Sequence, residues 1–326
     1  MKFLIVGCGS IGKRHAGNIR QINPDIELFA TDYLSDRTIP LIEAYNITPY
    51  DMLSHHVPFD GIIICVPTPD HMAYIKRAIE NGANVFVEKP ISDSLNGVTE
   101  VLRMVSDKGL IMQVGYQFRF HPGLQLVKKL LDENRIGKIL SIRAEFGQYL
   151  PDWRPNIDYT EHWGTWEEMG GGIISESSHE IDYVRWLSGG EVTHVSCFAG
   201  HVSSLEGNAD DTAEINLKFD NNVISNIHVD MTQRGYSRWC KVIGDKGNIY
   251  WDYTRRTNEL TVIIPEKQEL ETKYSSEDMY LEEMKSFIAC LEGKEKPLVD
   301  GETGKRVLEI CLAAKQSSKE NKVLEV

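Results

Sequence analysis

The sequence predicts an α/β protein in two parts: a doubly wound parallel sheet, then a second α/β part with a mostly antiparallel sheet. In the first part, short β-prone runs alternate with helical segments, which is typical of strands joined by helical crossovers. In the second part, β-branched and aromatic runs follow one another directly, separated by turns rich in Gly, Asn and Asp. With 326 residues the chain is too long for one ordinary core, and we expect domains at residues 1–120 and 121–326.

The first β-prone run, residues 2–6, leads directly into a glycine-rich turn at residues 7–12. This is the G-x-G-x-x-G pattern in its strand–turn–helix context. Gly7 permits the tight turn, Gly9 lets the backbone approach a pyrophosphate, and Gly12 allows close packing of the helix on the strand. The free N–H groups at the start of that helix suit phosphate oxygens. The pattern therefore predicts a Rossmann domain that binds a dinucleotide.

The second β-prone run, residues 26–31, ends at Asp32. An acid at this distance from the glycine turn hydrogen-bonds the adenosine ribose in dinucleotide-binding domains. Because a carboxylate repels the additional phosphate of NADP, Asp32 favours NAD. Arg37 lies near enough in the sequence to leave NADP possible, and Asp32 alternatively reads as a plain loop acid.

The alternation continues through three further strands. Residues 61–66 are too uniformly apolar for a half-exposed strand and are typical of a parallel strand buried on both faces. Helical segments at 71–81 and 95–108 separate this strand from those at 84–87 and 110–114. This order of strands and helices predicts a parallel, doubly wound sheet.

Lys89 stands between Glu88 and Pro90, immediately after the strand at residues 84–87. In open α/β sheets the functional crevice lies beyond the carboxyl ends of the strands, so a charged side chain placed there faces the ligand. Pro90 keeps the chain from continuing as a regular strand. Glu88 either aids the turn or contacts the nicotinamide ribose, or it is a solvent-exposed strand-end acid. The placement of Lys89 indicates an enzyme.

The second part of the sequence begins with a helical segment at residues 124–134, whose apolar residues recur at helical spacing. Two further helical segments, 277–291 and 303–316, close the chain. Between them, alternating and β-branched runs predict an antiparallel sheet with strands at 139–149, 192–202, 212–219, 223–232, 237–243 and 248–253.

The composition argues against several classes of function. Acids outnumber bases 48 to 35, a formal charge of −13, and the bases form no continuous block, so nucleic acid is a poor partner. No apolar stretch approaches the roughly 20 residues that a membrane-spanning helix needs. The first strand begins directly after Met1, which leaves no room for a cleavable signal, and we expect a cytoplasmic protein.

The cysteines and histidines do not suggest a metal site. A metal site would need clustered ligands, and His55-His56 is an isolated doublet. We therefore predict no metal. The six cysteines form no C-x-x-C pair and read as reduced, small buried side chains: Cys8, Cys65, Cys197, Cys240, Cys290 and Cys311.

Three further motifs accompany the glycine turn, at residues 66–71, 87–90 and 115–122. With them, the sequence resembles nearly end to end the family named for glucose-fructose oxidoreductase, inositol dehydrogenase and rhizopine catabolism (Gfo/Idh/MocA). The resemblance implies an N-terminal Rossmann domain, a C-terminal α/β domain with a large open-faced, mostly antiparallel sheet, and nicotinamide-dependent oxidation or reduction of a sugar or polyol. We expect cofactor contacts from Gly7, Gly9, Ser10, Ile11, Gly12, Asp32, Pro67, Thr68, His71, Glu88 and Lys89.

The segment at residues 149–159 looks like a subgroup whose members often accompany bacterial surface-sugar biosynthesis. This resemblance favours a nucleotide-linked or sialic-acid-like sugar over free inositol. This segment and the residues that follow it are dense in aromatics, whose rings either stack on the C–H faces of a sugar or pack the loop onto its domain. Arg154 either holds a carboxylate or phosphate of the substrate or is a solvated surface residue. The aromatic residues are Tyr149, Trp153, Tyr159, Trp163 and Trp166.

A glycine-rich stretch at residues 170–172 opens a helix that we expect to continue to Leu187, and this helix carries Glu176 and His179. Their spacing of three puts both on one face, where a carboxylate can orient an imidazole. The resemblance places His179 on the family's catalytic histidine; a structural histidine satisfied by a backbone carbonyl is the alternative. Inositol dehydrogenase-like members carry an aspartate four residues before that histidine, where this chain has Ser175, so the role of Glu176 is left open.

The predicted catalytic residues are Lys89, His179 and Glu176. We expect a secondary alcohol of a sugar to pass hydride to the nicotinamide while His179 or Lys89 removes the hydroxyl proton. A histidine, with a reference pKa of about 6.5, accepts a proton near neutrality more readily than a lysine at about 10.4. We therefore assign His179 as general base or acid and Lys89 as electrostatic partner, with the reverse order open. Substrate contacts are expected from Lys89, Tyr116, Arg119, Trp153, Arg154, Tyr159, Trp163 and His179.

Two other functions are compatible with these residues: a polyol or inositol dehydrogenase, and a non-catalytic NAD-binding sensor that keeps the Rossmann domain. The position of Glu176, one residue away from the family's aspartate, leaves the sensor open, whereas Lys89 and His179 argue for turnover. An open-faced sheet with one apolar surface has to be covered in water, so we expect a homodimer or homotetramer formed through the C-terminal sheet.

Overall fold

The computed structural model describes residues 1–51, 57–254, 258–264, 266–272 and 276–326; His55 and His56 lie outside these ranges. Contacts divide the chain into two compact units, residues 1–120 with 277–306 and residues 121–276 with 307–326. The sequence-based division gives all of 121–326 to one domain, whereas segment 277–306 belongs to the first unit. The reason is aromatic packing, because the ring of Phe287 lies 5.7 Å from that of Phe86 and 6.2 Å from that of Phe3.

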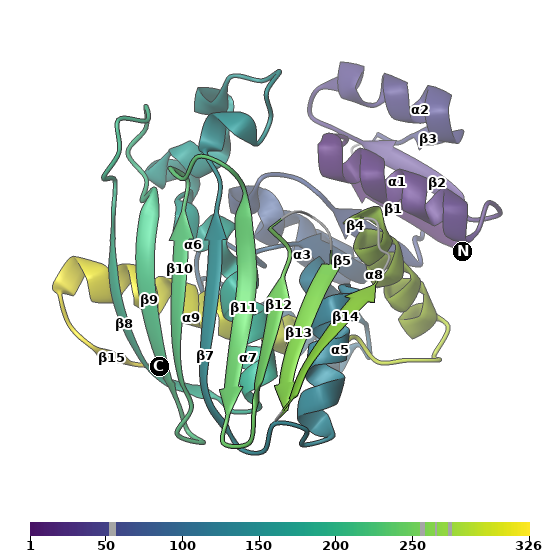
Figure 1. The fold of residues 1–326 in the computed structure, drawn as a ribbon. Helices are drawn as coiled ribbons and strands as arrows, with labels where there is room; N and C mark the ends of the chain where they lie inside the picture. The colour runs from purple at the N-terminus through teal and green to yellow at the C-terminus, as the bar shows by residue number, and fades with distance from the viewer. Residues whose placement is uncertain (52–56, 255–257, 265, 273–275) are drawn as a thin grey trace. The chain divides into compact units, whose positions relative to one another are not determined.

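The first unit is built on a six-stranded sheet in the order β3-β2-β1-β4-β5-β6, and all the neighbouring strands run parallel (Figure 1). Because the strands are parallel, their carboxyl ends meet at one edge of the sheet. The short β3 was not expected from the sequence. The strands are β1 (Lys2–Val6), β2 (Glu27–Thr31), β3 (Thr48–Pro49), β4 (Gly61–Ile64), β5 (Asn84–Glu88) and β6 (Met112–Gly115).

Helices pack against this sheet and bury its central strands. Phe3, Ile5, Ile63 and Phe86 are fully buried, and Phe287 is part of the same core. The continuous apolar run at β4 is therefore buried along its length, as the sequence predicts. The helices are α1 (Ser10–Ile22), α2 (Ile39–Tyr45), α3 (His71–Glu80), α4 (Val98–Asp107) and α8 (Ser276–Leu291), with 3-10 turns η1 (Ser35–Arg37), η2 (Thr68–Asp70) and η3 (Gln117–Phe120).

The second unit holds a nine-stranded sheet in the order β14-β13-β12-β11-β7-β10-β9-β8-β15. It is mostly antiparallel, and β7 and β10 are a parallel pair. The β13–β14 hairpin and β15 were not expected, because β14 is rich in Glu and Lys, which are depleted in strands. The strands are β7 (Ile139–Gly147), β8 (Val192–Gly200), β9 (Thr212–Phe219), β10 (Ile224–Asp230), β11 (Ser237–Gly244), β12 (Asn248–Asp252), β13 (Asn258–Ile264), β14 (Glu266–Thr272) and β15 (Leu324–Glu325).

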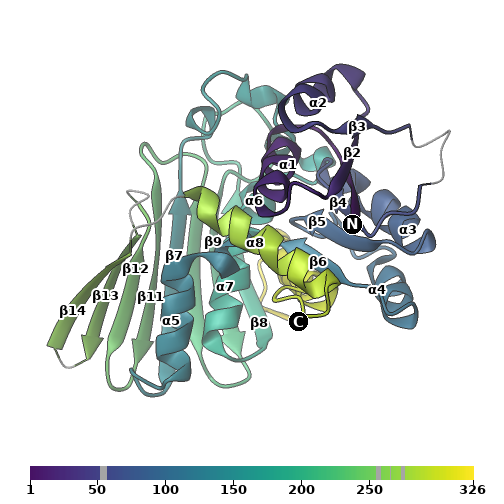
Figure 2. The same cartoon turned by 90° about the vertical axis from the view of Figure 1, so that its right-hand side faces the viewer.

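One face of this sheet is covered by helices, and α5 and α7 lie along it (Figure 2). His121 caps α5, since its Nδ1 accepts the N–H of Gly123 at 3.1 Å, and burial lowers the pKa of His121 to about 3. The helices of this unit are α5 (Pro122–Asp132), α6 (Ile173–Glu176), α7 (Ser178–Ser188) and α9 (Gly301–Glu320), whose later part belongs here. The 3-10 turns are η4 (Leu150–Asp152), η5 (Tyr159–Glu161), η6 (Trp163–Thr165) and η7 (Glu167–Met169).

The other face of the nine-stranded sheet is polar along β9, where the structure describes the side chains. Along β9, four buried apolar residues alternate with Thr212, Glu214, Asn216 and Lys218, which face outward. Exposed apolar residues such as Phe198 stand singly on this face. The expected oligomer formed through this sheet stays a prediction. Within the described ranges, no helix is both long and apolar enough to cross a membrane.

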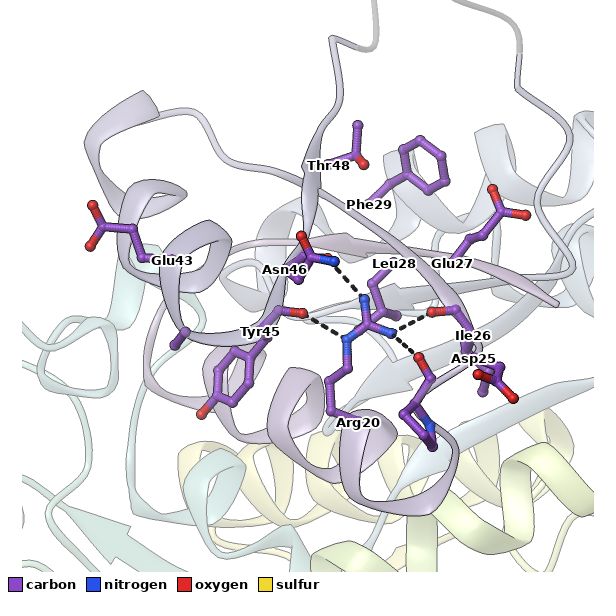
Figure 3. Close-up of a pocket in the computed structure, with 12 residues that line it drawn as sticks. Arg20, Asp25, Ile26, Glu27, Leu28, Phe29, Glu43, Tyr45, Asn46 and Thr48 are labelled. Atoms are coloured by element: carbon purple, nitrogen blue, oxygen red, sulfur yellow. Dashed lines mark hydrogen bonds between the residues drawn. The ribbon is translucent and has the colours of Figure 1, made fainter.

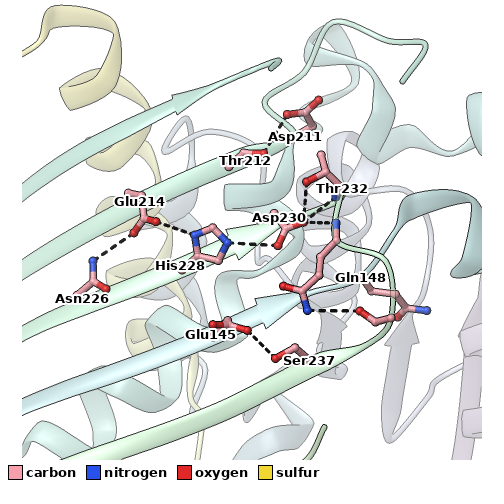
Figure 4. Close-up of polar contacts among 12 residues, drawn as sticks. Glu145, Gln148, Asp211, Thr212, Glu214, Asn226, His228, Asp230, Thr232 and Ser237 are labelled. Carbon is pink, nitrogen blue, oxygen red and sulfur yellow. Dashed lines mark hydrogen bonds and ion pairs between the residues drawn. The ribbon is translucent and has the colours of Figure 1, made fainter. Parts of the chain in front are cut away.

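A histidine–carboxylate network lies on this face and joins β9 to β10 (Figure 4). His228 lies between two carboxylates, with Nδ1 2.7 Å from Glu214 and Nε2 3.3 Å from Asp230. Asp230 also accepts the backbone N–H groups of Thr232 and Gln233. The hydrogen bonds that His228 donates to Asp230 and to Glu214 raise the pKa of His228 to about 9, so the ring is cationic near neutrality.

Candidate functional site

The glycine turn after β1 has the geometry of a diphosphate cradle. Gly7 has φ +93°, and a Cβ there would lie 2.6 Å from the carbonyl oxygen of Cys65. A Cβ on Gly12 would lie 2.0 Å from the carbonyl oxygen of Gly7, so only glycine lets α1 approach the strand this closely. A Cβ on Gly9 would meet nothing within 4 Å. The space over Gly9, at the N-terminus of α1, is therefore open to a ligand such as a diphosphate.

Ser10 and Ile11, the other two predicted contacts in this turn, begin α1. Ser10 is exposed, whereas Ile11 is partly buried and packs against the core of the unit. The neighbouring Cys8 is buried, and burial together with Asp32 raises the pKa of its thiol to about 12. Cys8 is therefore a protonated, structural thiol, and all six cysteines are buried and unbridged.

Asp32, directly after β2, braces the glycine turn. Its Oδ2 accepts the backbone N–H of Cys8 at 2.6 Å, and its Oδ1 accepts that of Leu34 at 2.8 Å. Each carboxylate oxygen has a second acceptor site, which suits a ribose hydroxyl. Arg37 lies exposed on η1. Asp32 thus fixes the backbone of the turn, and its expected contact with the adenosine ribose stays a prediction.

The segment after β4 supplies Pro67, Thr68 and His71. Pro67 is exposed and Thr68 is buried at the start of η2. His71 is 1% exposed, with Nδ1 2.9 Å from the carbonyl oxygen of Pro90 and Nε2 2.9 Å from that of Val66. Each ring nitrogen thus faces a backbone carbonyl, and because burial lowers the pKa of His71, the neutral ring donates to one of the two. The ring supports the loop, and the expected cofactor contact of His71 stays a prediction.

Glu88 and Lys89 follow at the end of β5, on the same sheet edge. Oε1 of Glu88 lies 2.7 Å from Nε2 of His15, a fully buried residue of α1. Lys89 is half-buried and is joined to Pro90 by a cis peptide bond. The sequence analysis did not foresee the contact between His15 and Glu88. The sequence feature that could have indicated this contact is the histidine among the apolar residues on the buried face of α1.

Tyr116 and Arg119 follow β6 at this edge. Tyr116 is fully buried and Arg119 is 4% exposed. Arg119 lies in η3, whose Gln117 donates to the hydroxyl of Tyr280 at 3.1 Å. The carboxyl edge of the first unit therefore gathers the glycine turn, Asp32, the segment after β4 and Lys89, as the parallel strand order requires.

A surface hollow lies at the opposite, amino-terminal edge of the same sheet (Figure 3). Its centre is Arg20, in the last turn of α1, whose guanidinium donates to four backbone carbonyls. These carbonyls belong to Pro24, Ile26, Tyr45 and Asn46. Because its N–H groups donate to carbonyls at the ends of α1 and α2 and at the start of β2, Arg20 holds these elements together. The hollow lies at the edge of the sheet opposite to the one where a dinucleotide binds.

In the second unit, the expected single helix that carries His179 is broken at Ser177. α6 ends at Glu176 and α7 starts at Ser178, so His179 lies in the first turn of α7 and is 6% exposed. The rule for residues three apart on one helix therefore does not apply to Glu176 and His179. α7 is tied to the sheet by the buried ion pair of Glu180 with Arg238, 2.9 Å apart.

The glycine-rich entry to α6 is fixed from two sides. Nζ of Lys315 donates to the carbonyl oxygen of Gly171 at 2.7 Å and to Oγ of Ser175 at 2.8 Å. Oδ2 of Asp210 accepts the backbone N–H of Ile174 at 3.0 Å, which stabilises the N-terminus of α6. Ser175 is thus a partner of Lys315.

Glu176 lies beside His162, a residue that the sequence analysis missed. Nδ1 of His162 accepts the N–H of Gly164 at 3.0 Å, so the ring proton sits on Nε2, which lies 3.5 Å from Oε1 of Glu176. Both side chains are 9% exposed. The spacing of His162 from Glu176 along the chain carries no signal, because the pair is formed by tertiary folding.

Hydrogen bonds from the polar atoms of its Trp and Tyr rings hold much of the aromatic segment at residues 149–169 in place. Nε1 of Trp153 donates to the Gln148 carbonyl at 2.9 Å, and Nε1 of Trp166 donates to that of Thr160 at 2.8 Å. The Tyr159 hydroxyl accepts the N–H of Glu206 at 3.0 Å. For these three rings, packing of the segment is the interpretation that the structure favours.

The remaining residues of this segment are placed differently. Trp163 stacks on His162, with ring centroids 5.7 Å apart, and Tyr149 lies under the guanidinium of Arg234, 3.5 Å from its ring centroid. Arg154 is exposed. Across the parts of the chain that the structure describes, no three His, Cys, Asp or Glu side chains gather as a metal site.

The parallel sheet with an open cradle at Gly9 and a carboxylate at Asp32 defines a dinucleotide-binding protein. Residues 1–116 match the family described as "Oxidoreductase family, NAD-binding Rossmann fold", and residues 124–250 match the "GFO/IDH/MocA C-terminal domain". The chain therefore belongs to the Gfo/Idh/MocA family of oxidoreductases, as the sequence motifs predicted, and it has an NAD-binding domain.

Relatives of known sequence and structure extend over the whole chain. It is 30% identical to the uncharacterised oxidoreductase YrbE of Bacillus subtilis, over 96% of this chain and 93% of YrbE. It is 28% identical to a myo-inositol 2-dehydrogenase of Thermotoga maritima, over 100% of this chain and 98% of that enzyme. The crystal structure of a probable dehydrogenase from Thermotoga maritima aligns with a TM-score of 0.83 at 27% identity, covering 100% of this chain and 98% of the other.

Proposed function

We propose that this oxidoreductase is an NAD-dependent dehydrogenase that acts on a secondary alcohol of a sugar or sugar derivative. The observation that carries the proposal is the carboxyl edge of the first unit, where the open turn at Gly9, the Asp32 carboxylate and Lys89 follow parallel strands of one sheet. The open turn admits the diphosphate, and Asp32 receives the adenosine ribose. When bound, NAD supplies the acceptor for the hydride that leaves the alcohol carbon.

In this proposal the chain's own residues handle the proton and the oxygen. His179 takes the hydroxyl proton, and the ammonium of Lys89 stabilises the oxygen as the C–O single bond becomes a carbonyl. The alcohol thus loses a hydride from carbon and a proton from oxygen, and a ketone results. The anchoring of α7 by Glu180 and Arg238 supports a fixed position for the imidazole. Glu176 is assigned to the support of His162.

For the substrate, we propose a nucleotide-linked or sialic-acid-like sugar, on the basis of the segment at residues 149–159. At the position where inositol dehydrogenase-like members carry an acid, this chain has Ser175, whose Oγ accepts a hydrogen bond from Lys315, and the missing acid fits a substrate other than inositol. A cyclitol is the second candidate, since full-length relatives are a myo-inositol 2-dehydrogenase and a scyllo-inositol 2-dehydrogenase.

We also propose that the second unit binds the substrate and forms a homodimer or homotetramer through its sheet. Analytical sedimentation of the protein at several concentrations tests the oligomeric state.

The test is a substrate panel with purified protein. UDP-N-acetylglucosamine, UDP-glucuronate, N-acetylneuraminate and myo-inositol are each offered with NAD and with NADP, and the absorbance of reduced nicotinamide is followed. We expect turnover of a charged sugar with NAD. Turnover of myo-inositol alone would favour the cyclitol, and tight NAD binding with no turnover on any sugar would favour a sensor.

The roles of the two residues are tested by substitution. Lys89→Ala and His179→Ala should each lower kcat by about a hundredfold or more and leave NAD affinity nearly unchanged. Lys76→Ala is the matched control, because Lys76 is half-exposed on α3 and pairs with Glu100. Turnover at the wild-type rate in either variant would remove that residue from the mechanism.

A further inference from the structure

Lys89 is flanked by two residues that are each held by a buried histidine. On one side, Glu88 Oε1 lies 2.7 Å from Nε2 of His15, which is fully buried. On the other side, the carbonyl oxygen of Pro90 lies 2.9 Å from Nδ1 of His71, which is 1% exposed. The two histidines stand on α1 and α3, the helices that follow β1 and β4. The backbone on both sides of Lys89 is therefore fixed from the interior of the first unit.

The contact of His15 with Glu88 occupies a place where an apolar side chain would serve packing better. His15 lies beside Ala16 and Ile19 on the buried face of α1, and its ring meets that of Phe86 edge-on at 5.0 Å. Burying an imidazole and a carboxylate costs desolvation energy that an aliphatic residue would not incur. We therefore explain the His15–Glu88 pair by the orientation that it imposes on the end of β5.

The neighbouring strand leaves room for the carboxylate. Gly115 is opposite Glu88 in the register of β5 and β6, and a Cβ on Gly115 would lie 3.1 Å from Oε2 of Glu88. With glycine there, the carboxyl group can lie against the sheet and meet His15. Glu88 is thereby directed into its own unit, and the residue that follows it at the end of β5 is Lys89.

We propose that His15 and His71 are positioning residues for Lys89, which they hold through Glu88 and through the carbonyl of Pro90. The inference rests on the proposed role of Lys89. An N–H of His15 fixes the Glu88 carboxylate, the His71 ring fixes the next peptide, and together they set where the lysine leaves the backbone. A displacement of about 1 Å at such a residue is enough to cost about a hundredfold in rate.

The test compares two substitutions of similar volume. His15→Met removes the N–H donor, whereas His15→Gln keeps a donor that can reach Glu88. Asn18→Leu, three residues along the buried face of α1, is the control for disturbance of the helix. The readouts are melting temperature, the Kd of NAD, kcat and KM on the sugar that the wild-type protein turns over, and the rate at which acetic anhydride labels Lys89.

We expect His15→Met to lower kcat by roughly tenfold or more with the Kd of NAD within about threefold of wild type, and His15→Gln to recover most of kcat. The labelling rate of Lys89 should change by roughly threefold or more in His15→Met and return toward wild type in His15→Gln. This labelling requires no substrate, so it decides the proposal even if the panel shows no turnover. Unchanged kcat and labelling in a folded His15→Met protein, or equal losses in both variants, would overturn the proposal.

Two further variants keep the result interpretable. Where His15→Met does not fold, Glu88→Gln breaks the charge of the same contact from the other side and should give the same loss of kcat with little change in NAD affinity. If Glu88→Gln instead raises the Kd of NAD and leaves kcat normal, Glu88 contacts the cofactor and the proposal is wrong. If no sugar of the panel is turned over, the proposed function fails; if Lys89→Ala turns over normally, the role of Lys89 fails; if only Lys89→Ala is slow, the positioning role alone fails.

Discussion

Gly9→Ala should separate ligand binding from folding, because this turn is open to the ligand and not filled by the protein. A Cβ at residue 9 meets nothing within 4 Å, and the backbone there has φ −69° and ψ −166°, which alanine adopts without strain. At residue 12, by contrast, a Cβ would lie 2.0 Å from the carbonyl oxygen of Gly7. The same one-carbon addition therefore has opposite consequences at two positions three residues apart.

The magnitudes follow from these contacts. For Gly9→Ala, alanine is a poorer N-cap than glycine but restricts the unfolded chain, and the two effects leave the free energy of unfolding within about 1 kcal/mol of wild type. The added methyl group displaces the diphosphate and weakens one charge-assisted hydrogen bond, a loss of about 2 kcal/mol, or roughly 30-fold in the Kd of NAD. For Gly12→Ala, the helix has to move from the strand, at about 1–3 kcal/mol.

The assay is a titration of NAD by calorimetry together with denaturant unfolding of each variant without ligand. We expect weak NAD binding with normal unfolding for Gly9→Ala, and lowered stability for Gly12→Ala. Normal NAD affinity in Gly9→Ala would refute the assignment of this turn as the diphosphate site. A large loss of stability in Gly9→Ala would show that the open space at residue 9 is not available.

Two other predictions concern Asp32 and His228. Asp32→Ser should raise the Kd of NAD about tenfold and improve the Kd of NADP relative to it, since the repelling charge is lost, and direct titration of both dinucleotides checks this. His228 has its pKa raised from 6.5 to about 9, so its contribution to stability is complete below about pH 6.5 and disappears as the pH rises through about 9. The shift corresponds to at most about 3 kcal/mol, and partial exposure of the ring reduces this to about 1 kcal/mol. Unfolding near pH 6 and near pH 10 should show this loss in wild type and not in His228→Gln; equal losses in both would contradict it.

The first unit was predictable from the sequence because its signals are local. The glycine spacing at residues 7–12, the acid at Asp32 and the apolar run at β4 each specify a conformation within a few residues, and the structure has all three. The aromatic contacts of Phe287 join residues about 200 positions apart in the chain, and no local pattern encodes them. For this reason α8 was assigned to the wrong part of the chain.

In the candidate site, the residue types were predictable but several partners were not. The break at Ser177 places Glu176 and His179 in two different helices, and Glu176 lies beside His162. The two ring nitrogens of His71 lie 2.9 Å from the carbonyl oxygens of Pro90 and Val66, and its expected cofactor contact stays a prediction. Partners of this kind depend on tertiary folding, which the spacing of residues along one helix or loop does not report.

The return of segment 277–306 to the first unit means that the nucleotide-binding half of the protein is not contiguous in the sequence. A fragment cut after residue 120 would lack α8 and would leave apolar side chains such as Phe3 and Phe86 facing water. During synthesis, the first 120 residues leave the ribosome long before α8, the helix that completes their core. This half therefore cannot finish folding until nearly the entire polypeptide has been made.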